Sequence, residues 1–207
     1  MIRLALPKGR NLEPALAALA AAGLELPVAS AERALRFTLE ADELEVLMLK
    51  DWDLPLYVGY GVADFGVVGS DVLGEVDGDL LGPLTLAAGH CRLSLIGRPG
   101  SVPRPGSQVR LATKYPRLAR RWVAQQSWSA EIVELAGSVE LAPLLELAEV
   151  AVDIVQTGRT LQANGLVELE VLQPVAPTLV VNRASYPRHR DRLNSLFRRL
   201  EVAGVAQ

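Results

Sequence analysis

The stretch VAVDIVQTGRTL, residues 150–161, decides the fold class, because its pattern is typical of a buried strand that ends in a turn and opens a helix. An apolar run that carries a single acid, Asp153, predicts the strand over residues 150–155. Thr157 and Gly158 break this run, and a helix is expected over residues 160–166. Such a junction offers backbone N–H groups, hydroxyls and the positive end of a helix dipole, which together favour a phosphate ligand.

Outward from this stretch, short apolar runs alternate with helical patterns along the chain. This alternation predicts an α/β fold with mostly parallel sheets. The expected strands cover residues 2–6, 37–39, 44–49, 64–68, 92–96, 109–112, 131–135, 150–155, 166–172 and 178–182. The expected helices cover residues 12–22, 53–59, 70–73, 116–126, 139–147, 160–166 and 187–202.

Two segments without a clear pattern, residues 80–89 and 172–177, are expected to be loops where the chain passes between domains. One domain would then comprise residues 1–88 plus 178–207, and the other residues 89–177. A ligand would bind in the cleft between them. A single large sheet is the alternative.

The composition excludes several classes of protein. Of the 207 residues, 50% are hydrophobic, and 21 basic against 24 acidic residues give a net charge of −3, so no overall attraction to nucleic acid is expected. The single cysteine excludes an intrachain disulfide and a cysteine zinc cluster, and two histidines cannot build a histidine-rich metal site. Asp153 could hold a metal ion, but no protein ligand of a metal is assigned. We find no signal peptide and no run long enough to span a bilayer, which favours a cytoplasmic protein.

Charged and small residues follow several expected strands at their carboxyl ends, where open α/β sheets bind ligands. Lys8, Gly9 and Arg10 follow the first strand, and Lys50 follows the third. Asp71 lies in a first helical turn, where the helix dipole alone explains an acid. Two further junctions, residues 112–116 and 137–143, have hydroxyls and acids, with Ser138 a possible cap and Glu140 close to it. The arginine-rich helix near the C-terminus is expected to be a solvated face.

The order and spacing of these segments resemble the ATP phosphoribosyltransferases, the family that opens histidine biosynthesis. The resemblance extends nearly from end to end. It rests on LPKGR at residues 6–10, DLPLYV at 53–58, GVADFGVVG at 61–69, ATKY at 112–115, GSVELAP at 137–143, DIVQTGRTL at 153–161, and the residues Val181, Asn182, Ser185 and Tyr186.

The resemblance implies a two-domain fold of the type II periplasmic-binding-protein kind, with the active site in the cleft. It implies ATP and 5-phosphoribosyl 1-diphosphate as substrates, with Mg²⁺, and N1-(5-phosphoribosyl)-ATP and diphosphate as products. It also implies the short form of the enzyme, without a C-terminal regulatory domain. Short forms work in a hetero-octamer with a regulatory subunit related to histidyl-tRNA synthetase, and the catalytic chain alone is expected to be a dimer.

Site residues follow from the same resemblance. The phosphoribosyl diphosphate would be held by Glu140, Asp153, Thr157, Gly158, Arg159 and Thr160. ATP would be held by Lys8, Gly9, Arg10, Arg33, Gly69 and Asp71, and the catalytic cations would be Lys8, Arg10, Arg33 and Lys50. The family often has Arg at the position of Lys50, and Lys keeps the charge but loses the bidentate fork.

Three other readings stay open at this point. The chain could be a phosphoribosyltransferase for a different base, since only the base pocket would then differ. It could be a ligand-binding protein without catalysis, or a degenerate regulatory homologue.

Overall fold

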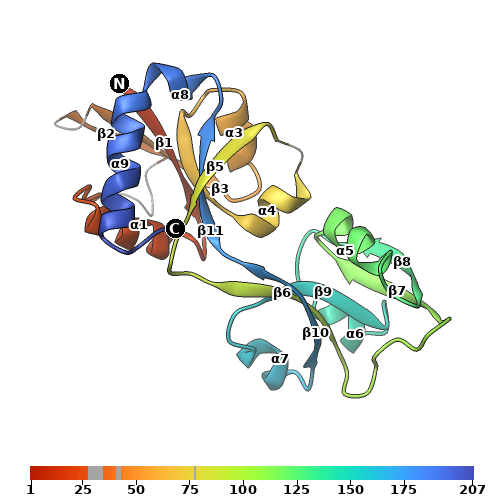
Figure 1. The fold of residues 1–207 in the computed structure, drawn as a ribbon. Coiled ribbons are helices and arrows are strands. Elements are labelled where there is room, and N and C mark those ends of the chain that lie inside the picture. The colour runs from red at the N-terminus through yellow and green to blue at the C-terminus, as the bar shows by residue number, and fades with distance from the viewer. Residues whose placement is uncertain (28–34, 41–42, 77) are drawn as a thin grey trace. The chain divides into compact units, whose positions relative to one another are not determined.

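The computed structural model describes residues 1–27, 35–40, 43–76 and 78–207, and the chain divides into two compact units. Unit 1 comprises Met1–Gly89 with Ala176–Gln207, and unit 2 comprises His90–Val175. Each unit has its own sheet with helices against it (Figure 1). The predicted two-domain α/β class is therefore confirmed, and the alternative of a single sheet is wrong.

Unit 1 is built on a six-stranded sheet in the order β2-β3-β1-β4-β11-β5. Its strands are β1 (Ile2–Lys8), β2 (Arg36–Leu39), β3 (Leu44–Lys50), β4 (Phe65–Gly69), β5 (Leu80–Thr85) and β11 (Pro177–Asn182). Its helices are α1 (Leu12–Ala21), α3 (Leu54–Gly59), α4 (Ser70–Glu75), α8 (Ser185–Arg188) and α9 (Arg190–Val202).

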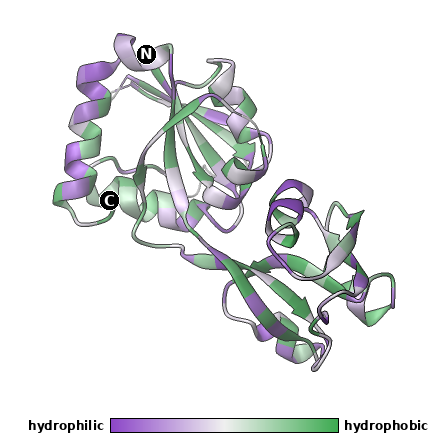
Figure 2. Cartoon of the chain, turned by 45° about the vertical axis from the view of Figure 1, so that its right-hand side comes forward, coloured by the Kyte–Doolittle hydropathy of each residue, from purple (hydrophilic) through white to green (hydrophobic). Residues whose placement is uncertain are grey.

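Helices cover both faces of the unit 1 sheet because its central strands are apolar on both sides. On one face, Leu4 and Phe65 pack in a core that includes α1 and α9. On the other face, Ala5 and Val68 pack with residues of α3 and α4. The strands are accordingly among the most hydrophobic parts of the chain (Figure 2).

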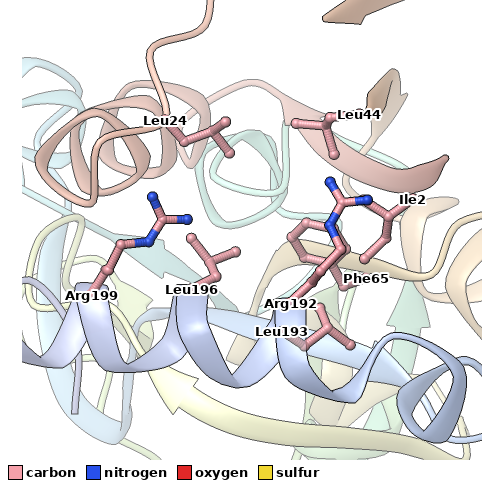
Figure 3. A pocket seen from close by; sticks show the side chains of 8 residues that line it. All are labelled: Ile2, Leu24, Leu44, Phe65, Arg192, Leu193, Leu196 and Arg199. Atoms are coloured by element: carbon pink, nitrogen blue, oxygen red, sulfur yellow. The ribbon is translucent and has the colours of Figure 1, made fainter. Parts of the chain in front are cut away.

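Helix α9 shows how the sequence pattern gives one buried and one solvated face. Leu193, Leu196 and Leu200 are buried at helical spacing, whereas Arg192 and Arg199 are exposed. Leu193 and Leu196 line a small hollow of about 70 Å³ with Ile2 and Phe65, and Arg192 and Arg199 also contribute to its lining (Figure 3). The prediction of a solvated basic face is confirmed.

Unit 2 is built on a five-stranded sheet in the order β10-β6-β9-β7-β8. Its strands are β6 (Cys91–Gly97), β7 (Gln108–Thr113), β8 (Ser129–Glu134), β9 (Val150–Val155) and β10 (Val167–Val175). Its helices are α5 (Pro116–Val123), α6 (Leu141–Leu144) and α7 (Arg159–Ala163). Residues of α6 and α7 pack with Ile96, Ala151 and Val155 on one face of this sheet.

The expectation of mostly parallel sheets is wrong, because both sheets are mixed. Parallel pairing is confined to β1 with β3 and β4 and to β7 with β8 and β9. The other described pairings are antiparallel. The chain leaves unit 1 after β5 and comes back in β11. The strands at the two crossings pair with each other, β5 with β11 in the sheet of unit 1 and β6 with β10 in the sheet of unit 2.

Both segments expected to be loops are largely strands, β5 within residues 80–89 and the end of β10 within residues 172–177. Pro174 and Pro177 favoured a loop locally in the second segment. Pro174 lies on β10 at the edge of its sheet, and Pro177 is the first residue of β11, and both are positions where a strand tolerates proline.

Two expected helices are also shorter or divided. The helix expected over residues 139–147 is only α6, and Glu146 just beyond it has a left-handed φ of 61°, which is incompatible with a continuing helix. The helix expected over residues 187–202 begins as α8 and is interrupted at His189 before α9.

Candidate active site

The loop after β9 lines a hollow of about 270 Å³ in unit 2. Its lining includes Glu140, Asp153, Thr157, Gly158 and Thr160, and the apolar remainder includes Ile96, Val155 and Leu161. Gly158 precedes α7 with φ of 75°, a conformation that glycine adopts without steric cost. The structure thus brings together these five predicted donor-binding residues around one cavity, whose lining includes the two hydroxyls of Thr157 and Thr160 and the two carboxylates of Glu140 and Asp153.

Asp153 is partly buried on β9 and is tuned by its neighbours. Burial raises the pKa of its carboxyl group, and the negative charge of Glu140 acts in the same direction. Lys114 Nζ, 3.5 Å from Asp153 Oδ1, opposes this rise, as does the backbone N–H of Ile154, which donates to Oδ1 at 2.8 Å. A carboxylate held beside a cation in this way is suited to accept hydrogen bonds from sugar hydroxyls.

Lys114 pairs with Asp153, which lines the hollow, and sequence reasoning did not select it. The signal was available, because it directly follows β7, and β7 and β9 are parallel neighbours whose carboxyl ends meet at one edge. The hydroxyl of Thr113 donates to the carbonyl of Val152 at 2.8 Å and accepts the N–H of Tyr115 at 2.9 Å, so it fixes the turn that carries Lys114.

Arg159 differs from the other predicted donor-binding residues. It is exposed and does not line the hollow. Its Nε instead donates to Thr157 Oγ1 at 3.4 Å. In this structure its cation lies at the rim of the loop.

In unit 1, the predicted cations gather where the parallel strands end. Lys8 and Lys50 are register partners at the last positions of β1 and β3. Gly9 follows with φ of 134°, a value that few side chains tolerate. Two ammonium groups on adjacent strand ends are the kind of donors that suit a polyphosphate ligand.

Arg10 is fixed by Asp71 at the same edge. Arg10 Nη2 donates to Asp71 Oδ1 at 2.7 Å, and the side chain of Asp71 is fully buried while that of Arg10 is 24% exposed. Gly69 leaves the space for this pair, since a Cβ there would lie 2.2 Å from Asp71 Oδ1. Beside it, buried Asn11 Nδ2 has no hydrogen-bond partner among the residues described, so this donor is available to a ligand or water.

Neither Ser70 nor Ser138 caps a helix through its side chain. Ser70 Oγ accepts the backbone N–H of Ala176 at 3.1 Å, and α4 has no side-chain cap. Ser138 has a left-handed φ of 48°, and α6 likewise lacks a side-chain cap. Arg33 lies outside the described residues.

Within the described ranges, the structure contains neither a metal-binding cluster nor a membrane-spanning helix. No group of three or more His, Cys, Asp or Glu side chains there could hold a metal ion. No helix in those ranges is long and apolar enough to cross a membrane.

Comparison with known proteins gives one consistent result. Residues 50–202 match the family model described as HisG: ATP phosphoribosyltransferase. The chain is 46% identical over 204 residues to the ATP phosphoribosyltransferase of Thermus thermophilus, covering 98% of this chain and 97% of that protein. It is 47% identical over 199 residues to the one from Deinococcus deserti, covering 96% and 91%. Its structure matches a chain of the ATP phosphoribosyl transferase (HisG:HisZ) complex from Thermotoga maritima with a TM-score of 0.82, 33% identity and 98% coverage of both chains.

Proposed function

The chain belongs to the ATP phosphoribosyltransferase family, and from that premise we propose which of its residues serve the phosphoribosyl donor and which serve ATP. This pentosyl transfer is the first step of histidine biosynthesis. The adenine N1 of ATP forms a bond to C1 of the donor ribose, the bond from C1 to the diphosphate oxygen breaks, and diphosphate leaves. Adenine N1 has a lone pair and no proton, so alignment and charge stabilisation matter more than a strong base.

The hollow of unit 2 is the observation that carries the assignment of the donor site. In this proposal, the turn at Thr157, Gly158 and Thr160 binds the 5-phosphate through backbone N–H groups and hydroxyls. Asp153 accepts hydrogen bonds from the ribose hydroxyls, and Lys114 keeps its carboxylate charged. Glu140 lies near the ribose, and Arg159 contributes its charge from the rim.

The edge of unit 1 with Lys8, Gly9, Arg10 and Lys50 is the proposed site of ATP and of charge development on the diphosphate. Arg33 belongs to the same proposal. The fully buried carboxylate of Asp71 supports a positioning role, in which it orients Arg10, and Gly69 makes room for that pair.

Members of this family generally use a divalent metal ion, and we propose Mg²⁺. Unit 2 offers Asp153 and Glu140 at the hollow rather than a protein cage, which fits an ion that arrives with substrate phosphates and keeps several water ligands. When bound, it would add positive charge beside the leaving diphosphate.

The partner and compartment are further parts of the proposal. The Thermotoga maritima structure is a HisG:HisZ complex. Its close match to this chain supports a regulatory subunit of the HisZ type, in a hetero-octamer as the resemblance implies. We also propose a cytoplasmic location.

The test is ATP-dependent diphosphate release by the purified chain with phosphoribosyl diphosphate and Mg²⁺, with and without a HisZ-type subunit. The proposal expects release in at least one condition. It expects Thr160→Ala to weaken donor binding without unfolding the chain, and Thr38→Ala, on the edge strand β2, to leave donor binding unchanged. Donor binding without ATP-dependent release in either condition would instead favour a different base as acceptor.

A further inference from the structure

A second charged network lies on unit 2 outside the residues assigned above. Arg92 on β6 donates through Nε and Nη2 to the two carboxylate oxygens of Glu168 on β10, at 2.5 Å each. Buried Ser94 adds its hydroxyl to Glu168 Oε1 at 2.6 Å. The hydrogen bond from Arg92 is the main cause of a lowered pKa of Glu168, so this carboxylate stays charged and paired.

The network shares a face of the sheet with the donor hollow. In the antiparallel pair β6–β9, Arg92 lies opposite Val155 and Ser94 lies opposite Asp153. Opposed residues project to the same face, and both Val155 and Asp153 line the hollow. Glu168 and Arg92 are therefore adjacent to the donor site without lining it.

One hydrogen bond connects the network to the donor loop. Arg92 Nη1 donates to the carbonyl oxygen of Gln156 at 3.4 Å, and Gln156 is the first residue after β9 and part of the lining of the hollow. A guanidinium group can serve two carboxylate oxygens and a carbonyl at once, because its donors spread in one plane. A lysine has no such fork.

We propose that Arg92 is a positioning residue for the donor-phosphate loop, and that Glu168 with Ser94 holds Arg92 in place. The inference rests on the proposed function insofar as the hollow binds the phosphoribosyl donor. Arg92 fixes the backbone at Gln156, where the loop leaves β9. The orientation of the N–H groups and hydroxyls at residues 157–160 depends on the position of that residue. Since Glu168 compensates the charge of Arg92, the pair brings no net charge to the phosphate site.

The experiment separates position from charge. The variants are Arg92→Lys, Arg92→Met, and Arg92→Met combined with Glu168→Met. Arg110→Met is the matched control, because the guanidinium of Arg110 also pairs with a carboxylate in the same unit, donating through Nε and Nη2 to Glu149 Oε1 at 3.1 and 2.5 Å. Neither residue lines the hollow. The readouts are donor affinity by calorimetry, KM for donor and for ATP, kcat, and thermal unfolding.

All three Arg92 variants are expected to lose donor affinity by about tenfold or more, which is below the roughly 100-fold loss of rate that a 1 Å misplacement can cause. The KM for ATP of the Arg92 variants should stay near the wild-type value. The donor affinity, KM and kcat of Arg110→Met should also stay near the wild-type values. Restored affinity in Arg92→Lys or in the double variant would show that only charge matters, and would overturn the inference. Equal affinities for Arg92→Met and Arg110→Met would do the same.

Hydrogen exchange of the backbone amides at residues 157–160 gives a readout independent of catalysis. Faster exchange in Arg92→Lys than in Arg110→Met is expected, and equal exchange would refute the positioning role. Wild-type diphosphate release measured in the same series separates the two hypotheses. A wild-type chain that binds donor but releases no diphosphate with ATP, either alone or with a HisZ-type subunit, contradicts the proposed function, while the exchange comparison still decides the role of Arg92.

Discussion

Replacing Gly69 with alanine tests whether the buried pair of Arg10 and Asp71 depends on an absent side chain. The backbone of Gly69 has φ of −67° and ψ of 138°, which alanine adopts without strain. An added Cβ would lie 2.2 Å from Asp71 Oδ1, whereas ordinary contact begins at 3.4 Å. The carboxylate must therefore withdraw by roughly 1 Å, the difference between these two distances, unless the backbone moves.

The expected cost follows from the pair that this movement disturbs. Asp71 Oδ1 is the atom that accepts Arg10 Nη2 at 2.7 Å, and its side chain is fully buried. Disrupting a buried pair costs about 3–5 kcal/mol, and we take the lower end because Arg10 is 24% exposed. About 3 kcal/mol corresponds to a decrease in Tm of roughly 6–12 °C for a chain of this size.

The measurement is thermal and urea unfolding of Gly69→Ala beside Gly59→Ala. Gly59 is the matched control, because it ends helix α3 and a Cβ there meets nothing within 4 Å. Alanine at a compatible site usually stabilises by about 0.4–1 kcal/mol, so the control should be neutral or more stable. If Gly69→Ala were as stable as the control, the space left by Gly69 would not be what allows this ion pair.

Three further predictions concern individual contacts. Asp153→Asn should abolish most donor binding yet stabilise the fold near neutral pH. Burial raises the pKa of Asp153 in the folded chain above the usual 3.8, so the wild-type chain loses stability as the pH rises from the unfolded pKa through the folded pKa. Urea unfolding across pH should show no such loss in the variant. Lys114→Met removes the cation 3.5 Å from Asp153, so the pKa of Asp153 should rise further and donor affinity should fall most at low pH, as calorimetry across pH would show. Asn182→Ala removes side-chain bonds of 2.8 and 3.0 Å to the last carbonyls of α3, and unfolding should become easier by about 2 kcal/mol; a change below about 0.5 kcal/mol would contradict this role.

The sequence predicted the existence of most elements because local signals are strong where an apolar run meets a glycine. The strand carrying Asp153 and its turn at Gly158 are examples, since the burial pattern and the left-handed residue lie within ten positions. The prediction from sequence failed where the structure of a segment depends on a neighbouring strand that lies far away in the sequence. Pro174 is a turn signal locally, and only the sheet order places it on an edge strand where proline is tolerated.

The same distinction applies to the site. Residues on one segment, such as Thr157 and Thr160, were predicted together because the segment itself brings them together. Lys114 was missed because its neighbour Asp153 lies 39 positions away along the chain, on an adjacent strand. For Asp71, the helix-turn position gave no indication that its side chain would be fully buried against Arg10.

The position of β11 has a consequence for synthesis on the ribosome. This strand lies between β4 and β5 in the sheet of unit 1, yet it follows all of unit 2 in the sequence. Unit 2 is continuous, so it can fold as soon as residue 175 has emerged. Unit 1 must wait for its interior strand, with β4 and β5 exposing unpaired edges meanwhile. The half of the protein that is translated first is therefore the half that is completed last, and a holdase chaperone acting on the nascent chain would have its target there.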